Sequence, residues 1–302
     1  MVSFIDAHRD RFDVESLCAV VVFPSSTYYA AKKRETAPSA RSVRDEQIAA
    51  EIRRVRAKKG CGMYGAKKVW KELLRDGVKV ARCTVERLMR KHGMTGLVAT
   101  RRRPRTTLPG DARDRPKDLV DREFRAPSPN QLWVVDITYI PLAGGGFCYA
   151  AFVTDVFSRA IVGWQVSDSL RAELALDALE MALWARKQKL SKALVHHGDR
   201  GVQYTSIRYA QRLAEAGIAQ SVGRTGDSYD NALAESMNAL YKKEVINRQD
   251  VWNSTAEVVR ATADWTYWYN NERLHSWCDY RPPMEFEQVF WQGPARQYPE
   301  AA

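Results

Sequence analysis

Asp136 interrupts a run of residues that is otherwise apolar. The run LWVVDITYIP is rich in β-branched and aromatic residues and predicts a strand over residues 132–141. A buried, ionised carboxylate is costly unless a cation meets it, and no Lys or Arg lies within this run. The strand therefore predicts a metal ion or a distant basic partner for Asp136. The alternative is a strand whose Asp side faces solvent.

Asp199 follows a second short apolar stretch, which predicts a buried strand over residues 193–197. Gly198 and Gly201 flank it, so it lies in a glycine-rich turn at the carboxyl end of that strand. Such turns commonly carry ligand-binding side chains. The alternative is an Asp that only forms the turn or caps a helix.

Glu235 belongs to a predicted helix over residues 231–245. At 100° per residue, Glu235 shares one face with Asn231, Asn238 and Lys242, while the apolar side chains of Leu233, Met237 and Leu240 lie roughly opposite. We expect the helix to pack by its apolar side and to present one carboxylate within a polar row. A solvated helix face is the alternative.

The elements around these acids predict a mixed α/β fold. Strands are expected at 132–141, 147–155 and 161–167, close enough in sequence to pair as an antiparallel meander. A helix at 173–188, the strand at 193–197, a helix at 207–216 and a strand at 218–222 follow. This is the element order of the ribonuclease H fold, a five-stranded sheet flanked by helices. Asp155 is expected to shape a turn, and Asp227 and Asp230 to organise the approach to the Glu235 helix.

The front part of the chain predicts an all-helical, DNA-binding domain over residues 45–98. Apolar residues recur at helical spacing over 45–59 and 66–75, and Thr84 is expected to cap a helix that runs to His92. Two short helices with a basic outer face fit a helix-turn-helix, whose second helix would enter a major groove. A purely structural helical hairpin has the same pattern. The predicted DNA contacts of this domain are Arg82, Arg87, Arg90 and Lys91.

Positive charge is concentrated in the same front part. Of the net charge of +11, residues 1–125 contribute 30 Lys and Arg against 16 Asp and Glu, whereas residues 126–302 contribute 17 against 20. Residues 99–130 contain five prolines and the basic block Arg101, Arg102 and Arg103, which predicts a linker that also follows a DNA backbone. The expected domains are a helical segment at 1–44, the helix-turn-helix at 45–98, this linker, a core at 131–290 and a tail at 291–302.

Other classes of protein are disfavoured. No run of 18 apolar residues occurs, and the first eleven residues already carry charges, so neither a membrane span nor a secretion signal is expected. We therefore expect a cytoplasmic protein. The five cysteines are scattered, without the close pairs of zinc or redox sites, and predict reduced thiols packed as small apolar side chains.

Several motifs together resemble one family. VVDITYI, HHGDRGVQYTS, TGDSYDNALAESMNALYKKE and YNNERLHS resemble the successive signatures of the integrase core in transposases of the insertion sequence 3 family, specifically their OrfB-type proteins. MYGAKKVWKELLRDG and VARCTVERLMRKHG resemble the helix-turn-helix that precedes this core. The resemblance covers roughly residues 45–290, and 35 residues separate Asp199 from Glu235, as in the D…D-35-E triad of the superfamily.

The resemblance assigns the metal-binding, catalytic triad to Asp136, Asp199 and Glu235. It also implies that Lys242, seven residues after Glu235, holds a DNA phosphate. The further positions that match family motifs and are expected near the site are Gly201, Gln203, Tyr204, Tyr229, Asn231, Arg273 and His275.

The sequence departs from the family pattern at two places. Where the family has R-x-H-S-S-L-G-Y, this chain has Trp277, Cys278 and Asp279 in place of the small, Leu and Gly residues, which questions the packing there. Gly198 replaces the usual Ser, a change we expect to be harmless.

The resemblance implies an enzyme that cleaves DNA at the ends of an insertion sequence and joins them to target DNA. Three carboxylates of this kind would hold two Mg²⁺ (or Mn²⁺) ions roughly 4 Å apart. The implied partners are double-stranded DNA, an upstream-frame OrfA protein or fusion, and further copies of the chain. Two alternatives remain: a repressor that binds element ends without cutting, and a ribonuclease-H-like nuclease that hydrolyses without joining.

Overall fold

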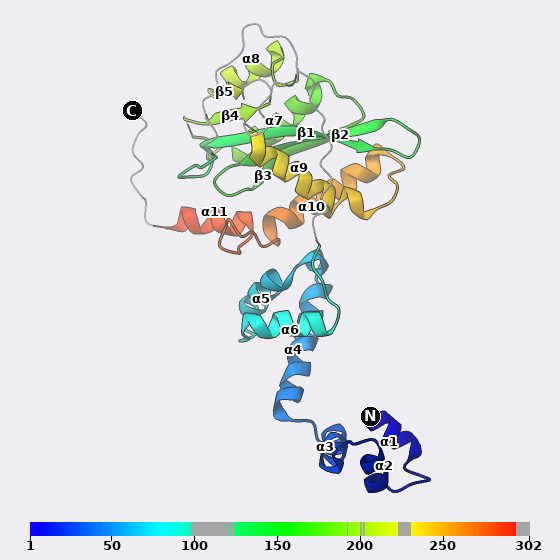
Figure 1. The fold of residues 1–302 in the computed structure, drawn as a ribbon. Helices are drawn as coiled ribbons and strands as arrows, with labels where there is room; N and C mark the ends of the chain where they lie inside the picture. Colours follow the sequence, from blue (N-terminus) through cyan, green and yellow to red (C-terminus); the bar gives the residue numbers. More distant parts are fainter. Residues whose placement is uncertain are drawn as a thin grey trace. The chain divides into compact units, whose positions relative to one another are not determined.

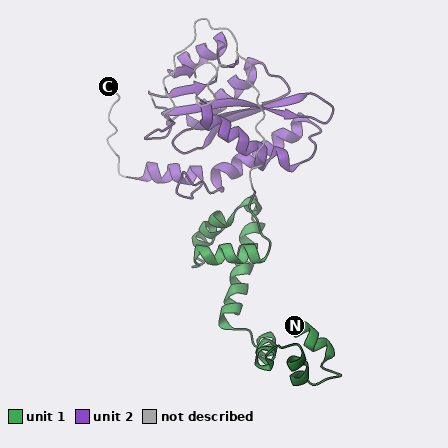
Figure 2. Ribbon diagram, in the orientation of Figure 1, with its two compact units in different colours: residues 1–96 green, residues 97–302 purple. Residues whose placement is uncertain are grey.

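The computed structural model describes residues 1–97, 120, 124–191, 193–199, 201, 203–222 and 231–293. Within them the chain forms two compact units, Met1–Gly96 and Leu97–Ala302, coloured separately in Figure 2. Arg101, Arg102, Arg103, Tyr229, Asp227 and Asp230 lie outside the described residues, as do most of the predicted linker and tail.

The first unit is helical throughout its described length. Its first three helices are α1 (Val2–His8), α2 (Val14–Val20) and α3 (Ser25–Thr36), which bury Ile5, Leu17, Cys18 and Tyr28 among themselves. The sequence predicted a helical segment over residues 1–44 but not its division into these three helices. Helix α4 (Ala40–Ala57) follows and is longer than expected, because Ser39 caps it by accepting a hydrogen bond from the backbone N–H of Ser42.

The helix-turn-helix consists of α5 (Ala66–Arg75) and α6 (Arg82–Lys91), preceded by the short 3₁₀ turn η1 (Cys61–Met63). Both helices pack on α4 and on each other. The buried side chains are Ile48, Ile52, Val55, Val69, Leu73, Val85, Leu88 and Met89. The expected cap at Thr84 is wrong: the cap position is Ala81, so α6 begins three residues earlier than expected and has no side-chain cap.

The second unit contains the predicted five-stranded sheet, whose strand order is β3-β2-β1-β4-β5 (Figure 1). Strands β1 (Leu132–Pro141), β2 (Phe147–Asp155) and β3 (Ile161–Ser167) are antiparallel, while β4 (Val195–Gly198) and β5 (Ala219–Val222) continue the sheet parallel to β1. The predicted ribonuclease-H-like fold is confirmed.

Helices pack on both faces of this sheet. On one face, α7 (Ala172–Arg186) and α8 (Ile207–Glu215) cover a core that includes Trp133 and Val135. Gly163 of β3 is required there, because a Cβ would lie 2.1 Å from the carbonyl oxygen of Ala178. On the other face, α9 (Ala232–Glu244) packs over β1, with Ala234 against Leu132 and Val134.

The chain after α9 continues through a 3₁₀ turn, η3 (Ile246–Arg248), to α10 (Thr255–Asn271) and α11 (Pro283–Gln292). A buried ion pair ties α11 to the core: Arg186 of α7 donates to Glu287, whose carboxylate also accepts a hydrogen bond of 2.6 Å from Ser158. Among the described residues, no helix is long and apolar enough to cross a membrane.

Candidate active site

Helix α9 lies across β1 through two asparagines of its polar row. Asn231 donates its side-chain amide to the carbonyl oxygen of Val135 at 3.0 Å, and Asn238 donates to Oδ2 of Asp136 at 2.9 Å. Both asparagines are buried. The predicted packing of α9 by its apolar side is therefore incomplete, since Asn231 and Asn238 of the polar row also turn inward to reach the backbone and carboxylate of β1.

Asp136 is half-buried in the middle of β1. Besides the bond from Asn238, its Oδ1 accepts the backbone N–H of Ile137 at 2.8 Å. Burial raises the pKa of this carboxyl to about 8, and the negative charges of Asp199 and Glu235 add to the rise. Asp136 thus stands in a site with uncompensated negative charge.

The parallel pairing of β1 with β4 brings Asp199 beside Asp136. Trp133 is opposite His196 and Val134 is opposite His197. This pairing ends at Val134 and His197, and β4 ends at Gly198, so Asp199 follows at the carboxyl end of β4, next to β1. The charge of Asp199 contributes to the raised pKa of Asp136, which indicates that the two carboxyl groups are near each other. Two residues distant in sequence are thus brought together by the sheet.

The turn after β4 shapes the surroundings of Asp199. The backbone N–H of Gly201 donates to its Oδ1 at 2.9 Å. A Cβ at residue 201 would lie 2.9 Å from that same oxygen and 3.0 Å from Oε1 of Gln203, so only glycine fits without displacing these groups. Asp199 is exposed at this turn, and partial desolvation by the surrounding protein atoms raises its pKa.

Glu235 completes the group from the first turn of α9, where its side chain is exposed. Partial burial and the charge of Asp199 raise its pKa. The charge of Asp199 therefore raises the pKa of both Asp136 and Glu235, and the charge of Glu235 raises the pKa of Asp136. The sheet and α9 together bring the three predicted carboxylates into one electrostatic site.

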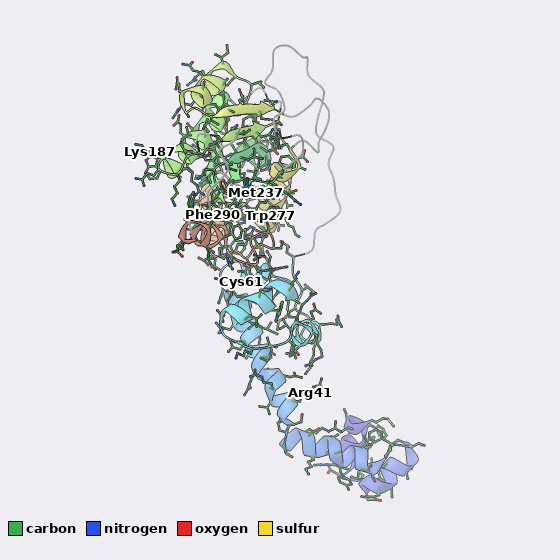
Figure 3. The ribbon with its side chains drawn as sticks, turned by 90° about the vertical axis from the view of Figure 1, so that its left-hand side faces the viewer. Arg41, Cys61, Lys187, Met237, Trp277 and Phe290 are labelled. Atoms are coloured by element: carbon green, nitrogen blue, oxygen red, sulfur yellow. The ribbon has the colours of Figure 1, made fainter. Side chains whose placement is uncertain are left out.

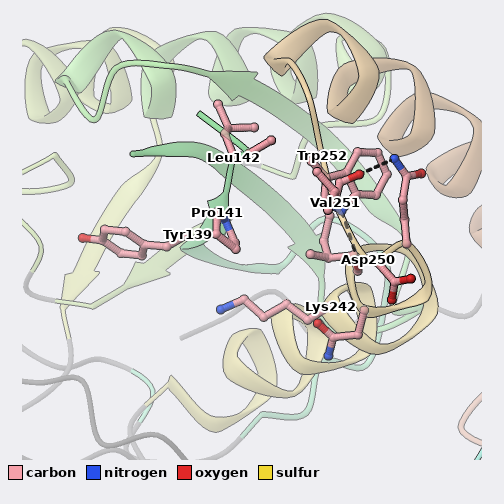
Figure 4. A pocket seen from close by; sticks show the side chains of 11 residues that line it. Tyr139, Pro141, Leu142, Lys242, Asp250, Val251 and Trp252 are labelled. Atoms are coloured by element: carbon pink, nitrogen blue, oxygen red, sulfur yellow. Dashed lines mark hydrogen bonds between the residues drawn. The ribbon is translucent and has the colours of Figure 1, made fainter. Parts of the chain in front are cut away.

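Lys242 lies two turns further along α9, half-buried. Burial lowers the pKa of its ammonium group, and the charge of Asp136 opposes that change. The Lys242 ammonium is therefore close enough to Asp136 to interact with its charge. Figure 4 shows Lys242 with Pro141 of β1 around a cavity of about 350 Å³.

Gln203 and Tyr204 lie behind the Asp199 turn. Gln203 donates to the carbonyl oxygen of Leu170 at 2.9 Å. The buried Tyr204 has its ring against Gly198, and its hydroxyl has no hydrogen-bond partner among the described residues. Burial raises the Tyr204 pKa well above its ordinary value, with smaller contributions from Tyr209, Asp136 and Asp199, so the hydroxyl lies near the carboxylates.

Arg273 and His275 occupy the opposite end of α9 from Glu235. The guanidinium of Arg273 is buried against Glu244, the last residue of α9, at 2.7 Å, and the ring of His275 stacks edge-on against Tyr269. Nine helical residues separate Glu235 from Glu244, about 13 Å along the axis. The expectation that Arg273 and His275 lie near the site is corrected: Arg273 joins the segment after α10 to the end of α9, and His275 packs on Tyr269 of α10.

The structure also reveals supports that sequence reasoning missed. The buried side chains of His196 and His197, just before the Asp199 turn, pair with Tyr209 at 2.9 Å and with Ser221 at 2.8 Å. Burial lowers the pKa of His196 to about 3, so this histidine is neutral. Two adjacent histidines before the Gly-Asp turn were the available signal.

In the first unit, two of the basic residues predicted to bind DNA form ion pairs within the protein. Arg82 pairs with Glu86 at 2.6 Å and Arg87 with Asp45 at 2.7 Å. Arg90 and Lys91 lie in the last turn of α6. A cavity of about 450 Å³ at the start of α6 is lined by basic residues that the sequence reading had not selected, namely Arg41, Arg44 and Lys79, together with Arg87.

The carboxylate group suits a hard divalent cation in its chemistry. All three acids offer oxygen ligands, the kind that Mg²⁺ prefers. Burial, with contributions from neighbouring acids, raises the pKa values of these carboxyl groups, so a bound cation would favour their ionised forms. Within the described ranges, no three acidic, histidine or cysteine side chains converge as a preformed metal cage would. Mg²⁺ commonly binds through one or two carboxylates plus substrate phosphate, so an open arrangement also fits.

Comparison with protein families identifies the class of this fold. Models described as integrase core domain match residues 126–228 and 216–283, and a model described as HTH-like domain matches residues 43–105. The matched regions include all three carboxylates and the helix-turn-helix. The class is therefore an integrase core preceded by a helix-turn-helix.

Full-length relatives narrow the class to one family. The chain is 49% identical over 279 residues to a putative transposase for insertion sequence element IS986/IS6110 of Mycobacterium tuberculosis, covering 91% of this chain and 98% of the relative. It is 46% identical to the transposase for IS629 of Shigella sonnei (96% and 97% covered) and 33% identical to transposase InsF for IS3A of Escherichia coli (94% and 97% covered). The chain belongs to the transposases of the insertion sequence 3 family.

Solved structures with related folds are more distant. The catalytic core of HTLV-2 integrase in complex with magnesium aligns with a TM-score of 0.41 and 14% identity, covering 54% of this chain and 99% of that chain. A simian T-cell lymphotropic virus intasome aligns with a TM-score of 0.47 over 79% of this chain and 75% of that chain.

Proposed function

We propose that this transposase cleaves DNA at the ends of an insertion sequence and joins those ends to target DNA, with Asp136, Asp199 and Glu235 as its metal ligands. The observation that carries the proposal is the arrangement of three elements: β1 with Asp136 pairs with β4, which ends just before Asp199, and α9, which carries Glu235, contacts Asp136 through Asn238 at 2.9 Å. Such a group is unfavourable unless cations bind to it.

The cations we propose are two Mg²⁺ (or Mn²⁺) ions. Bound there, they would activate the attacking water or DNA 3′-hydroxyl and stabilise the departing oxygen. The protein's own part is to hold the ligands. Asn238 orients Asp136, the backbone N–H of Gly201 orients Asp199, and α9 carries Glu235.

Lys242 is proposed as the contact to a DNA phosphate beside the metals. It lies on the same side of α9 as Asn238 and within the field of Asp136. A partly desolvated ammonium attracts a phosphate more strongly than an exposed one because the local dielectric constant is lower. Gln203, Tyr204 and Asn231 are proposed as supports of the site rather than as reacting groups.

The first unit is proposed to bind the ends of the element. Arg41, Arg44 and Lys79 line a cavity at the start of α6, where the uncapped helix end also favours an anion. We add these three to Arg82, Arg87, Arg90 and Lys91 as proposed phosphate contacts. Arg101, Arg102 and Arg103 are kept as sequence-based proposals.

Double-stranded DNA, both terminal repeats and target, is the proposed partner. An upstream-frame OrfA protein or fusion and a multimeric assembly on DNA are proposed from the family relationship. Since the substrate would be chromosomal DNA, the bacterial cytoplasm is the proposed compartment.

Incubation of the protein with labelled element ends, target DNA and Mg²⁺ tests the proposal. The wild type is expected to give joined products, and Asp199→Asn is expected to give none above background. Joining that survives Asp199→Asn would overturn the site assignment. Binding without cleavage would instead indicate a repressor, and cleavage without joining would indicate a nuclease.

A further inference from the structure

Helices α1, α2 and α3 have no specific role in the function proposed above. They precede residue 43, where the match to the HTH-like domain begins, and so lie outside every region that the family models match. Figure 1 shows these three helices in blue, and Figure 3 shows their side chains. Their buried side chains form a core of their own, made of Ile5, Leu17, Cys18 and Tyr28. Residues 2–36 are therefore a small three-helix bundle.

The connection between α2 and α3 is a tight turn of residues 21–24. Val22 has a φ of +52°, in the left-handed region, and its N–H donates to the carbonyl oxygen of Ala19 at 3.3 Å. The N–H of Phe23 donates to the carbonyl oxygen of Cys18 at 2.9 Å, which completes the pair of bonds that ends many helices. A turn of about three or four residues, often with a glycine, joins the two helices of a helix-turn-helix. The turn after α2 has this length and this backbone conformation.

Contacts with α1 and α2 fix the orientation of α3. The buried Tyr28 of α3 donates its hydroxyl to Asp6 of α1 at 2.8 Å, and Lys32 pairs with the same carboxylate at 3.1 Å. Tyr29 donates its hydroxyl to Glu15 of α2 at 3.0 Å. The side of α3 that carries Tyr28 is therefore held against the other two helices, and the opposite side is presented to solvent.

That opposite side is the outward face of α3, whose exposed residues are Ser26, Thr27, Ala30, Lys33 and Arg34. Its side chains near the helix start are small. A helix with small side chains can approach base edges closely, and serine and threonine hydroxyls bond to bases while alanine contacts the thymine methyl group. The first residues of the second helix are the ones that contact bases in a helix-turn-helix.

Charge and shape favour DNA over a protein as the occupant of the outward face. Helix α3 contains three basic residues and one acid, and Lys33 and Arg34 lie on the outward face, where they can contact phosphates. A helix that docks in a protein groove presents large apolar side chains at spacings of three and four residues. On the outward face of α3, which lies wholly within the described part of the chain, the apolar side chain is only Ala30.

We propose that α2 and α3 form a second helix-turn-helix, and that the outward face of α3 reads base sequence in a major groove at the element end. The inference rests on the proposed function, because it takes the element end as the DNA. Ser26, Thr27 and Ala30 face the base edges, and Lys33 and Arg34 contact the backbone. The chain then recognises two segments of the terminal repeat, one through α6 and one through α3.

A matched pair of substitutions in the full chain tests this proposal. Ala30→Glu places a negative charge on the outward face of α3. Ala7→Glu is the control: it makes the same change at an exposed position of α1, on the side opposite the buried Ile5. Affinity is measured by fluorescence anisotropy in EDTA at one salt concentration. The two probes are a duplex with the terminal repeat and a duplex of the same bases in shuffled order.

Ala30→Glu is expected to weaken binding to the terminal repeat by roughly tenfold or more, the range of lost base contacts, and to lower the preference over the shuffled duplex. Ala7→Glu should stay within about threefold of the wild type, because salt screens a charge that lies away from the DNA. A double variant, Ser26→Ala with Thr27→Ala, should lower the preference severalfold without a change of charge, and thermal melts verify that each variant is folded. Equal losses for Ala30→Glu and Ala7→Glu, or an unchanged preference in the double variant, would overturn the proposal.

A parallel joining assay in Mg²⁺ separates this inference from the proposed function. Joining by the wild type, with a sequence preference that neither α3 variant alters, would reject the reading by α3 alone. A preference that falls in the α3 variants, without any joining by the wild type, would support the reading and reject the proposed reaction. A wild type that binds both duplexes equally would overturn the inference, since no sequence would then be read.

Discussion

At the scale of single residues, the ionised carboxylate of Asp136 is needed for the proposed metal binding but destabilises the metal-free fold. Its pKa is raised to about 8 from the ordinary 3.8 by burial and by two neighbouring acids. In the absence of a cation, the folded protein binds this proton more tightly than the unfolded chain does. The carboxylate therefore destabilises the metal-free fold increasingly as the pH rises from about 4 to about 8.

Asp136→Asn is accordingly expected to stabilise the metal-free protein. The gain should be small near pH 4 and should grow towards pH 8, where we expect the melting temperature to rise by about 3 °C or more. Thermal melts in EDTA across this range measure it, and Mg²⁺ should raise the melting temperature of the wild type more than that of the variant. A gain in melting temperature that shrinks with rising pH would show that the Asp136 carboxylate does not destabilise the metal-free fold.

Asp279 is a second residue-scale feature, at a departure from the family pattern. Its φ of +52° lies in the left-handed region, where the family pattern has Gly. The surrounding Trp277 and Cys278 nevertheless pack well: their side chains donate to the carbonyl oxygens of Phe157 and Ser158 at 2.8 and 3.1 Å. The departure is therefore accommodated, with backbone strain confined to the glycine position and its neighbour Tyr280.

Asp279→Gly is expected to increase the free energy of unfolding by about 0.5–1 kcal/mol, since glycine relieves the left-handed strain but loses more chain entropy. Urea denaturation measures the change. A destabilised variant would mean that the Asp279 side chain makes a contact more valuable than the strain it causes.

At the scale of elements, alternating and helical patterns predicted β1, β2 and β3 with the observed bounds, and α5 as well. The patterns failed where tertiary contacts decide. Nothing local indicates that Asn231 and Asn238 turn α9 inward onto β1, or that Arg273 pairs with Glu244 instead of the acids. The start of α6 was missed because Ala81 gives no capping signal.

Element α4 supplies a prediction for DNA binding. Arg41 and Arg44 line the cavity at the start of α6, and we expect Arg41→Ala with Arg44→Ala to weaken binding to duplex DNA. If both contact phosphates, the slope of log affinity against log salt should fall by about 1.8. The control is Arg53→Ala, also on α4, whose guanidinium is paired with Glu46 at 2.6 Å. An unchanged slope would show that neither arginine contacts a phosphate.

At the scale of the whole molecule, the excess of positive charge and the three candidate metal ligands lie in different parts of the chain. The excess of Lys and Arg lies within residues 1–125, while the three acids lie beyond it. The family resemblance, rather than composition, selected these acids from 36 Asp and Glu. Periodicity placed each of them on its element, but the pairing of β1 with β4 and the packing of α9 on β1 explain why they meet.

This separation predicts that metal removal uncouples binding from reaction. In EDTA, affinity for element ends should stay within about threefold of its value in Mg²⁺, because phosphate contacts by Lys and Arg dominate affinity. Joining should be abolished. Anisotropy and gel assays on the same samples measure both, and an equal loss of binding would place the main DNA contacts at the metal site instead.

The central claim, that the acids bind the metal directly, is tested most directly by a change of metal preference at Asp199. A thiolate is a softer ligand than a carboxylate and disfavours Mg²⁺ relative to Mn²⁺. Asp199→Cys is therefore predicted to lose joining in Mg²⁺ and to recover part of it in Mn²⁺, whereas Asp199→Asn stays inactive in both. Equal joining by Asp199→Cys and the wild type in Mg²⁺, or the same loss for both variants in both metals, would contradict direct metal binding by Asp199.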